Sequence, residues 1–275
     1  MKFYKFWCKY NGVLIGGSLF AVMVIVAVFA PLIATHDPTT MNIRNRLQPP
    51  GGEHIAGTDE FGRDVFSRII YGARISLTIS LSVLFFTGLV GTVLGLLSGF
   101  YDLGDTIIMR FMDGLMAFPT IILSLVILTV LGSGIHNMVI ALSISQLPRV
   151  VRTVRTTVLS VKQHEHVEAA RAMGASDMRI MFRYILPMCI SPLVIVLTLI
   201  MALTILNEAA LTFLGVGLSP QIPSWGVILS EARMYITTSP YLIFLPGIAI
   251  VWAVLSLNML GDGLRDVLDP RLNTN

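Results

Sequence analysis

The residues whose types and spacing could do chemistry gather in one charged stretch, His166–Pro187, set between long apolar segments. Glu168, Ala169 and Ala170 lie among good helix formers, which predicts a helix over 163–173. Gly174 follows where a left-handed C-terminal cap is expected. A segment of this kind, held between membrane spans, is expected to bind a soluble partner rather than to catalyse a reaction.

A second short helix is predicted directly after this turn. Ser176 can cap its start, and Asp177 in the first turn suits the helix dipole. Pro187 is expected to end it where the fifth span begins. A helix, a tight turn and a helix suit docking into a groove of another protein. The alternative is a solvated hairpin without a partner.

Catalytic chemistry has no support in the sequence. The four lysines never follow a glycine in a Gly-Lys-Ser/Thr phosphate-binding loop, so any use of ATP must come from a partner. No nucleophile–base pair or metal-ligand cluster argues for an enzyme, and no metal site is predicted. His36 and His54 are expected to face outward, where they could contact a metal ion if the cargo were nickel.

The composition indicates the class of protein that positions these residues. The chain is 55% hydrophobic and 13% charged, with a mean hydropathy of +0.79, whereas soluble domains carry about 25% charged residues. It is therefore an integral membrane protein. Its basic residues are not interleaved with aromatics, which argues against nucleic-acid binding. A pI near 9.0 fits basic loops against anionic lipid.

Six membrane-spanning helices are predicted, long enough to cross about 30 Å of hydrocarbon. They are Gly12–Ala34, Ile75–Gly99, Leu115–Leu131, Ile135–Leu147 and beyond, Cys189–Leu206 and beyond, and Tyr241–Leu260. The fourth is short before Pro148, so it is expected to continue as a helix that carries Arg149, Arg152 and Arg155 into the cytoplasm.

The distribution of basic residues predicts the orientation. Of 19 lysines and arginines, six fall in predicted outer segments and thirteen in predicted inner ones. Both termini are therefore expected in the cytoplasm. The first 74 residues are read as an N-terminal segment, the first span and an outer loop, in which Asp64 and the apolar residues after it predict an interfacial helix. Residues 75–275 then form a five-helix core that contains the cytoplasmic loop 161–188.

Other polar residues have two interpretations each. Asn207 and Glu208, late in the fifth span, could line a transport path or form a structural hydrogen bond. Arg63, Asp64 and Arg68 could brace the outer loop or contact an external protein. Two further groups are expected to be structural: Asp113 pairing with Arg110, and a C-terminal cytoplasmic network of Asp262, Arg265, Asp266, Asp269 and Arg271.

Glu168-Ala-Ala, Gly174 and Leu186-Pro187, with their spacing, resemble the coupling loop of the permease subunits of ATP-binding-cassette importers. One departure is Tyr184, which stands where the general pattern has isoleucine. Other segments resemble the "C"-type permease of the peptide/nickel branch: 54–68 with 72–77, 112–119, 213–217 with 223–226, and 261–271. Together they cover nearly the whole chain.

The resemblance implies an all-α type I importer permease in a bacterial or archaeal cytoplasmic membrane. Its expected partners are a second permease, two ATPase subunits that bind ATP and Mg²⁺, and an external substrate-binding protein. It also implies that Glu168, Ala169, Ala170, Gly174, Leu186 and Pro187 couple ATPase closure to alternating access. The expected cargo is short peptides. Nickel or a metal chelate is the alternative within the family, and a self-contained secondary transporter is the alternative of a different class.

Overall fold

The computed structural model describes residues 2–268, with side chains from residue 11 onward, and every regular element in this range is helical. The helices are α1 Lys2–Val28, α2 Ala30–Ile33, η1 Ile43–Asn45, α3 Val65–Phe100, α4 Asp102–Met116, α5 Thr120–Leu131, α6 Ile135–Val161, α7 Glu165–Ala172, α8 Asp177–Ile180, the π turn η2 Met181–Ile185, α9 Leu186–Phe213, α10 Trp225–Ala232, η3 Arg233–Tyr235 and α11 Tyr241–Leu268.

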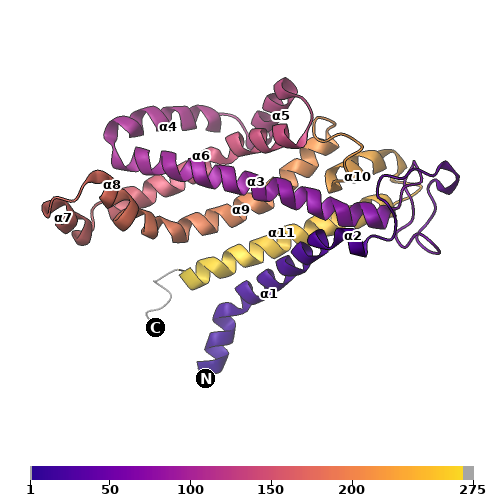
Figure 1. Cartoon of the computed structure of the whole chain (residues 1–275), viewed down its shortest axis with the longest axis horizontal. Coiled ribbons are helices and arrows are strands. Elements are labelled where there is room, and N and C mark those ends of the chain that lie inside the picture. Colours follow the sequence, from indigo (N-terminus) through magenta and orange to yellow (C-terminus); the bar gives the residue numbers. More distant parts are fainter. Residues whose placement is uncertain (1, 269–275) are drawn as a thin grey trace.

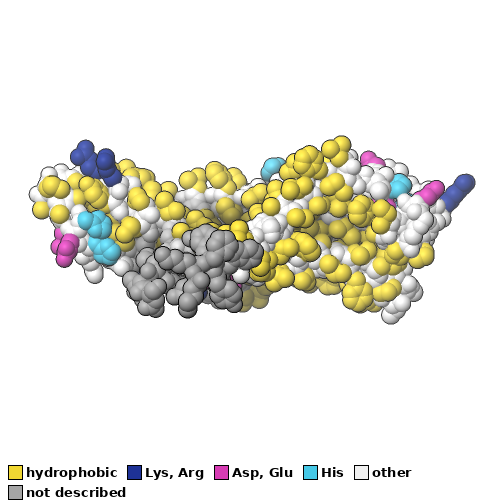
Figure 2. Space-filling model, turned by 90° about the horizontal axis from the view of Figure 1, so that it is seen from below, with side chains coloured by type: hydrophobic (Ala, Val, Ile, Leu, Met, Phe, Trp, Pro, Cys, Tyr) yellow, Lys and Arg dark blue, Asp and Glu magenta, His cyan; other side chains and the backbone are white. Residues whose placement is uncertain are grey.

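The long helices form an elongated bundle (Figure 1). α3 packs along α6, α1 packs along α11, and α9 lies between the two pairs. α7 and α8 lie at one end of the bundle, whereas the 34–64 loop and α10 lie at the other. Figure 2 shows charged and histidine side chains at the two ends of the face it presents, with mainly apolar side chains between them. This surface is typical of a membrane protein.

Within residues 2–268, four helical segments are long and apolar enough to cross a membrane: 11–28, 65–100, 177–213 and 241–268. α4 and α5 together are also long and apolar enough, but they meet at 90°. They add a fifth span if the pair is one broken span. α6 falls outside this group, since its second half carries arginines, but it runs unbroken to Val161. The predicted continuation of the fourth helix past Pro148 is therefore confirmed, whereas six spans are not.

The predicted third span, Leu115–Leu131, is not one continuous helix. α4 ends at Met116, and a new helix starts at Thr120 in a different direction. Pro119 at the break has an extended ψ of 135°, and a proline also disfavours the helical conformation in the residue before it. Apolar composition continues across this break, and for that reason hydropathy alone joins the two helices.

The separate outer interfacial helix is also wrong. The amphipathic residues after Asp64 form the first turns of α3, which continues without interruption for 36 residues. The boundary predicted between residues 74 and 75 falls inside this helix. Gly72 does not break the helix. Its lack of a side chain makes room for Trp225, because a Cβ at Gly72 would lie only 2.8 Å from the indole ring.

α3 and α6 approach closely along a row of glycines. A Cβ added at Gly91, Gly95 or Gly99 would lie only 2.5–2.7 Å from the Cβ atoms of three fully buried valines of α6. These valines are Val150, Val154 and Val158. Small residues that let two helices touch are the usual means of packing in membranes, where burial of apolar surface gives little driving force.

Candidate functional site

The hairpin of α7 and α8 is built around the turn at Gly174, which has φ +81°. The Gly174 amide donates to the carbonyl of Arg171 at 3.0 Å, and the Ala175 amide donates to the carbonyl of Ala170 at 3.1 Å. This pair of bonds is a Schellman cap, which ends α7 and turns the chain into α8. Ser176 occupies the position before α8, but its side chain makes no capping hydrogen bond, so the predicted side-chain cap is wrong.

The predicted coupling residues divide between two faces of the hairpin. Val167 and Ala170 are buried against the bundle, whereas Glu168, Ala169 and Gly174 are exposed. Met173 is 79% exposed and Met178 is 60% exposed. The exposed residues of the hairpin therefore include the Glu168 carboxylate, the small side chain of Ala169 and two flexible methionines, which were not predicted from the sequence.

The second arm of the hairpin leads into α9 without a break. η2 lies between α8 and Leu186, so residues 177–213 form one 37-residue helical segment. Pro187 does not end a helix, which corrects the prediction. It lies in the first turn of α9, where the amide that proline lacks is not required, and the π turn before it shifts the hydrogen-bond register. Leu186 is half-buried and Pro187 is exposed.

Two side chains that the sequence analysis did not assign fix the base of the hairpin. The Lys162 ammonium donates to the Phe100 carbonyl at 2.9 Å and lies 5.6 Å from the centroid of the Phe100 ring. The Tyr101 hydroxyl donates to the Asp177 carboxylate at 3.3 Å. Both contacts join the hairpin region to the end of α3.

The arginines of α6 pair with α4. Arg152 lies 2.9 Å from Asp113, and Arg155 makes a bidentate pair with Asp105. The expected partner of Asp113 was Arg110, but a side chain of the neighbouring helix takes that place. These pairs attach α4 to the half of α6 that was expected to emerge into the cytoplasm.

Glu208 is buried, and it joins three elements. Its Oε2 accepts from Ser76 of α3 at 3.0 Å, and its Oε1 accepts from Ser224, just before α10, at 3.0 Å. Thr212, one turn along α9, donates at 3.3 Å. Asn207 is only half-buried. The structure therefore gives Glu208 a structural hydrogen-bond network, and it leaves Asn207 as the more accessible of the two.

The 34–64 loop has a core of buried charges. Arg63 lies 2.6 Å from Asp59 and 2.8 Å from Glu231, and Arg68 lies 2.8 Å from Glu231. Arg63 and Arg68 are 2% and 1% exposed. Burial raises the pKa of the Glu231 carboxyl, an effect that Arg68 and Arg63 oppose. Two arginines and two carboxylates balance in charge and fasten the loop to α10.

Asp64 is buried as well and caps α3, accepting from the Ser67 amide at 2.8 Å through Oδ2. Its other oxygen, Oδ1, lies 2.9 Å from His54 Nδ1. Burial by itself raises the pKa of Asp64, but the bonds from Ser67 and His54 outweigh it, so the pKa lies below its usual range. Arg63, Asp64 and Arg68 thus make their polar contacts within the chain.

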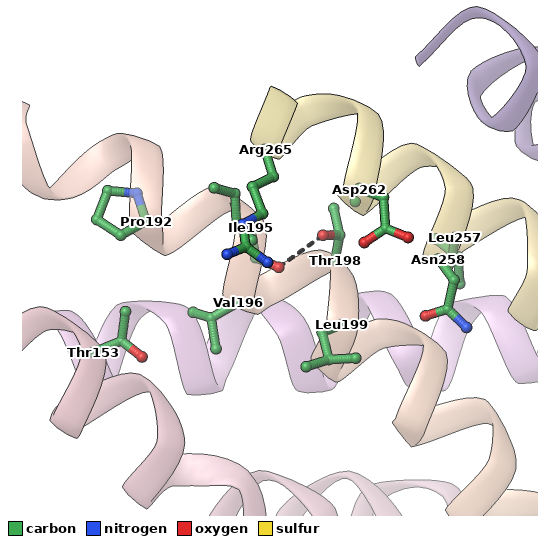
Figure 3. Close-up of a pocket in the computed structure, with 11 residues that line it drawn as sticks. Thr153, Pro192, Ile195, Val196, Thr198, Leu199, Leu257, Asn258, Asp262 and Arg265 are labelled. Atoms are coloured by element: carbon green, nitrogen blue, oxygen red, sulfur yellow. Dashed lines mark hydrogen bonds between the residues drawn. The ribbon is translucent and has the colours of Figure 1, made fainter. Parts of the chain in front are cut away.

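A cavity of about 390 Å³ opens between α6, α9 and α11 (Figure 3). Asn258, Asp262 and Arg265 of α11 line it opposite apolar residues of α9 such as Val196 and Leu199. Asp262 and Arg265 therefore belong to a long helix rather than to a C-terminal tail. Asp266 of the expected network lies on the same helix, whereas Asp269 and Arg271 lie outside the described residues.

Comparison with known proteins covers almost the entire sequence. Residues 91–274 match the family model described as "Binding-protein-dependent transport system inner membrane component", and residues 8–50 match "N-terminal TM domain of oligopeptide transport permease C".

Several relatives are similar along most of their lengths. A dipeptide transport system permease protein of Alkalihalophilus pseudofirmus is 40% identical over 95% of this chain and 86% of that protein. A di/tripeptide transport system permease protein of Pseudomonas aeruginosa is 42% identical over 98% of this chain and 92% of that protein. A glutathione transport system permease protein of Pectobacterium atrosepticum is 40% identical over 98% and 91%.

The fold is also similar to that of a solved structure. A chain from the crystal structure of an amino acid ABC transporter with histidines superposes with a TM-score of 0.54, covering 75% of this chain and 95% of that one at 18% identity. The helical bundle is thus an ABC permease fold. The chain belongs to the family of binding-protein-dependent transport system inner membrane components, with the N-terminal domain of an oligopeptide transport permease C.

Proposed function

We propose that this chain forms half of an inward path for short peptides, opened and closed by partner ATPases. A second, similar permease completes the path, and an external binding protein delivers the peptide. The observation that carries the proposal is the exposed hairpin of α7 and α8, which lies at the end of the bundle opposite the outer loop. Relatives named for dipeptide and di/tripeptide transport support the choice of cargo.

The hairpin is the element through which an ATPase moves the bundle. Glu168 pairs with a basic group in the ATPase groove, while Ala169 and Met173 fill it. Ala170 lies beneath this face, the Gly174 cap holds its shape, and Leu186 and Pro187 carry its movement into α9. ATP and Mg²⁺ bind to the ATPases, and this chain supplies only the docking surface.

The proposed topology has six spans and both termini in the cytoplasm. α6 supplies the span that composition alone does not support, because its apolar first half packs against α3 and its arginines pair with α4. The broken pair α4 and α5 counts as one span. The 34–64 loop is then external, and the binding protein contacts its exposed surface while Arg63, Asp64 and Arg68 hold the loop in place. Asn207 faces the translocation path, braced from behind by Glu208.

Nickel or a metal chelate remains the alternative cargo. The observation that favours it is a group of His36, His54 and Asp64, whose ligand atoms lie within 4.8 Å of one another. A self-contained secondary transporter receives no such support.

The deciding experiment is reconstitution of this chain with a second permease, two ATPase subunits and a binding protein from the same organism. We expect ATP-dependent uptake of labelled dipeptide, with no uptake of ⁶³Ni²⁺. Glu168→Ala should abolish peptide-stimulated ATP hydrolysis without loss of membrane insertion. Glu165→Ala is the matched control, since Glu165 is also exposed on α7. Uptake by the chain alone, or full activity of Glu168→Ala, would contradict the proposal.

A further inference from the structure

Three potential metal ligands from separate segments meet at the outer end of the molecule. His36 follows α2, His54 lies in a tight turn closed by its reciprocal backbone bonds with Gly51, and Asp64 precedes α3. His54 Nδ1 lies 2.9 Å and His36 Nδ1 lies 3.7 Å from the same oxygen, Asp64 Oδ1. The two imidazole rings are 4.8 Å apart between centroids.

The two histidines are held differently. His54 can donate to Asp64 at 2.9 Å, whereas the 3.7 Å from His36 Nδ1 to Asp64 Oδ1 is too long for a hydrogen bond. His36 Nδ1 lies 3.1 Å from the Thr35 hydroxyl instead, and this exposed hydroxyl can rotate away when an ion binds. The two carboxylate oxygens of Asp64 have different contacts. Oδ2 caps α3, and Oδ1 faces both imidazole rings. Ligand atoms around one ion at about 2.1 Å stand roughly 3–4 Å from one another, and these spacings fall close to that range.

The site is accessible from one side. A cavity of about 270 Å³ adjoins the three residues, and its lining adds the carboxylates of Asp37 and Glu53. The His36 side chain is 41% exposed, whereas those of His54 and Asp64 are 9% and 1% exposed. An ion could therefore enter from solution, keep water on its open side and find two ligands already fixed.

We propose that His36, His54 and Asp64 bind one divalent transition-metal ion. Two imidazoles and one carboxylate suit Zn²⁺ or Ni²⁺ rather than Ca²⁺ or Mg²⁺, which prefer oxygen ligands alone. The ion joins the segment after α2 and the turn at His54 to the start of α3. This is a resident site of the outer loop, and it does not depend on which cargo the transporter carries.

Isothermal titration of the purified full-length chain, freed of metal and carrying no histidine tag, tests the proposal with Zn²⁺ and Ni²⁺ in turn. We expect one saturable site per chain. His36→Gln should lower the affinity at least 10-fold, and it leaves the core intact because His36 is exposed. Asp64→Asn should lower it likewise, since asparagine still caps α3 but lacks the charge.

His136→Gln and His166→Gln are the matched controls, because these histidines lie on α6 and α7, away from the cluster. Both should bind like the unchanged chain. X-ray absorption of the Zn²⁺-loaded chain should show two imidazole ligands, and one in His36→Gln. Absence of saturable binding, equal affinity in His36→Gln, or equal loss in the controls would overturn the site. None of these readouts measures transport.

Discussion

At the residue scale, the polar side chains inside this membrane protein hold elements together. Glu208 accepts hydrogen bonds from three hydroxyl groups, which lie on α3, on α9 and at the start of α10. Arg63 and Arg68 both pair with Glu231 of α10. A buried polar group is tolerated only with such partners. These groups therefore help to hold together the end of the bundle that carries α10 and the 34–64 loop (Figure 1).

Glu208→Ala should lower the thermal stability of the detergent-solubilised chain by roughly 2 kcal/mol, because the hydroxyls of Ser76 and Ser224 would lose their acceptor in a buried place. Glu208→Gln keeps one acceptor and should cost clearly less. Thermal unfolding followed by fluorescence measures both. Equal losses in the two variants would show that the carboxylate contributes through its charge instead.

Arg68→Met should destabilise the chain by about 3–5 kcal/mol, since one arginine would leave the buried Glu231 short of positive charge. Arg74→Met is the matched control, because Arg74 is an exposed arginine of the same helix. It should unfold at the temperature of the unchanged chain. Equal effects of the two substitutions would contradict a specific role for the buried network.

At the element scale, two features control how the helices meet. The glycines of α3 allow contact with the valines of α6, and the cap at Gly174 sets the angle between α7 and α8. Each feature depends on a glycine for a different reason: absence of a side chain in the first, a positive φ in the second.

Gly95→Ala should cost about 1–3 kcal/mol, because the new methyl group would lie 2.6 Å from the Val154 Cβ. Trimming Val154 to alanine cannot relieve the contact, since its Cβ remains. Gly247→Ala serves as the control, because a Cβ there meets no atom within 4 Å. Melting temperatures should fall only for the α3 variant. An unchanged value would mean that the two helices separate readily.

Gly174→Ala should loosen the hairpin locally, since a side chain at φ +81° costs about 1–2 kcal/mol. Hydrogen exchange of the Gly174 and Ala175 amides should quicken, while the overall melting temperature stays the same. Gly174→Asn should recover much of the protection, because asparagine tolerates this conformation. Faster exchange throughout the bundle would contradict a local role.

The sequence sufficed where structure follows from nearby residues. The Gly174 turn and the continuation of α6 past Pro148 were predicted from local helix preferences, and the structure has both. The pairing of Arg63 and Arg68 with Glu231 was not predicted, because Glu231 lies 168 and 163 residues away from them in the sequence. The unbroken α3 was missed because its amphipathic first turns resemble a surface helix, although their buried partners come from α10 and the loop.

At the scale of the whole molecule, the face that Figure 2 presents has charged and histidine side chains at its two ends and mainly apolar side chains between them. The 34–64 loop and the hairpin are at opposite ends of the bundle. The two ends therefore face different aqueous compartments if the chain spans the membrane, and this arrangement makes the proposed orientation testable.

Single cysteines at Glu53 and at Met173, in a chain without Cys8 and Cys189, should label differently. A membrane-impermeant maleimide should reach Glu53→Cys in right-side-out vesicles and Met173→Cys only in inverted ones. Both positions are exposed, so burial does not confound the comparison. The reverse pattern would place the termini outside.

The unbroken run from α8 through η2 to the end of α9 makes this part of the molecule a lever. At about 1.5 Å per residue, its 37 residues span roughly 55 Å. A rotation of about 10° at the Asp177 end would sweep the Phe213 end through roughly 10 Å on this length. Pro192 inside α9 removes one backbone donor, and η2 is a second mechanical weak point, where the hydrogen-bond register changes within a single turn. The stiffness of that turn determines how much of a displacement at the Asp177 end is transmitted to the Phe213 end.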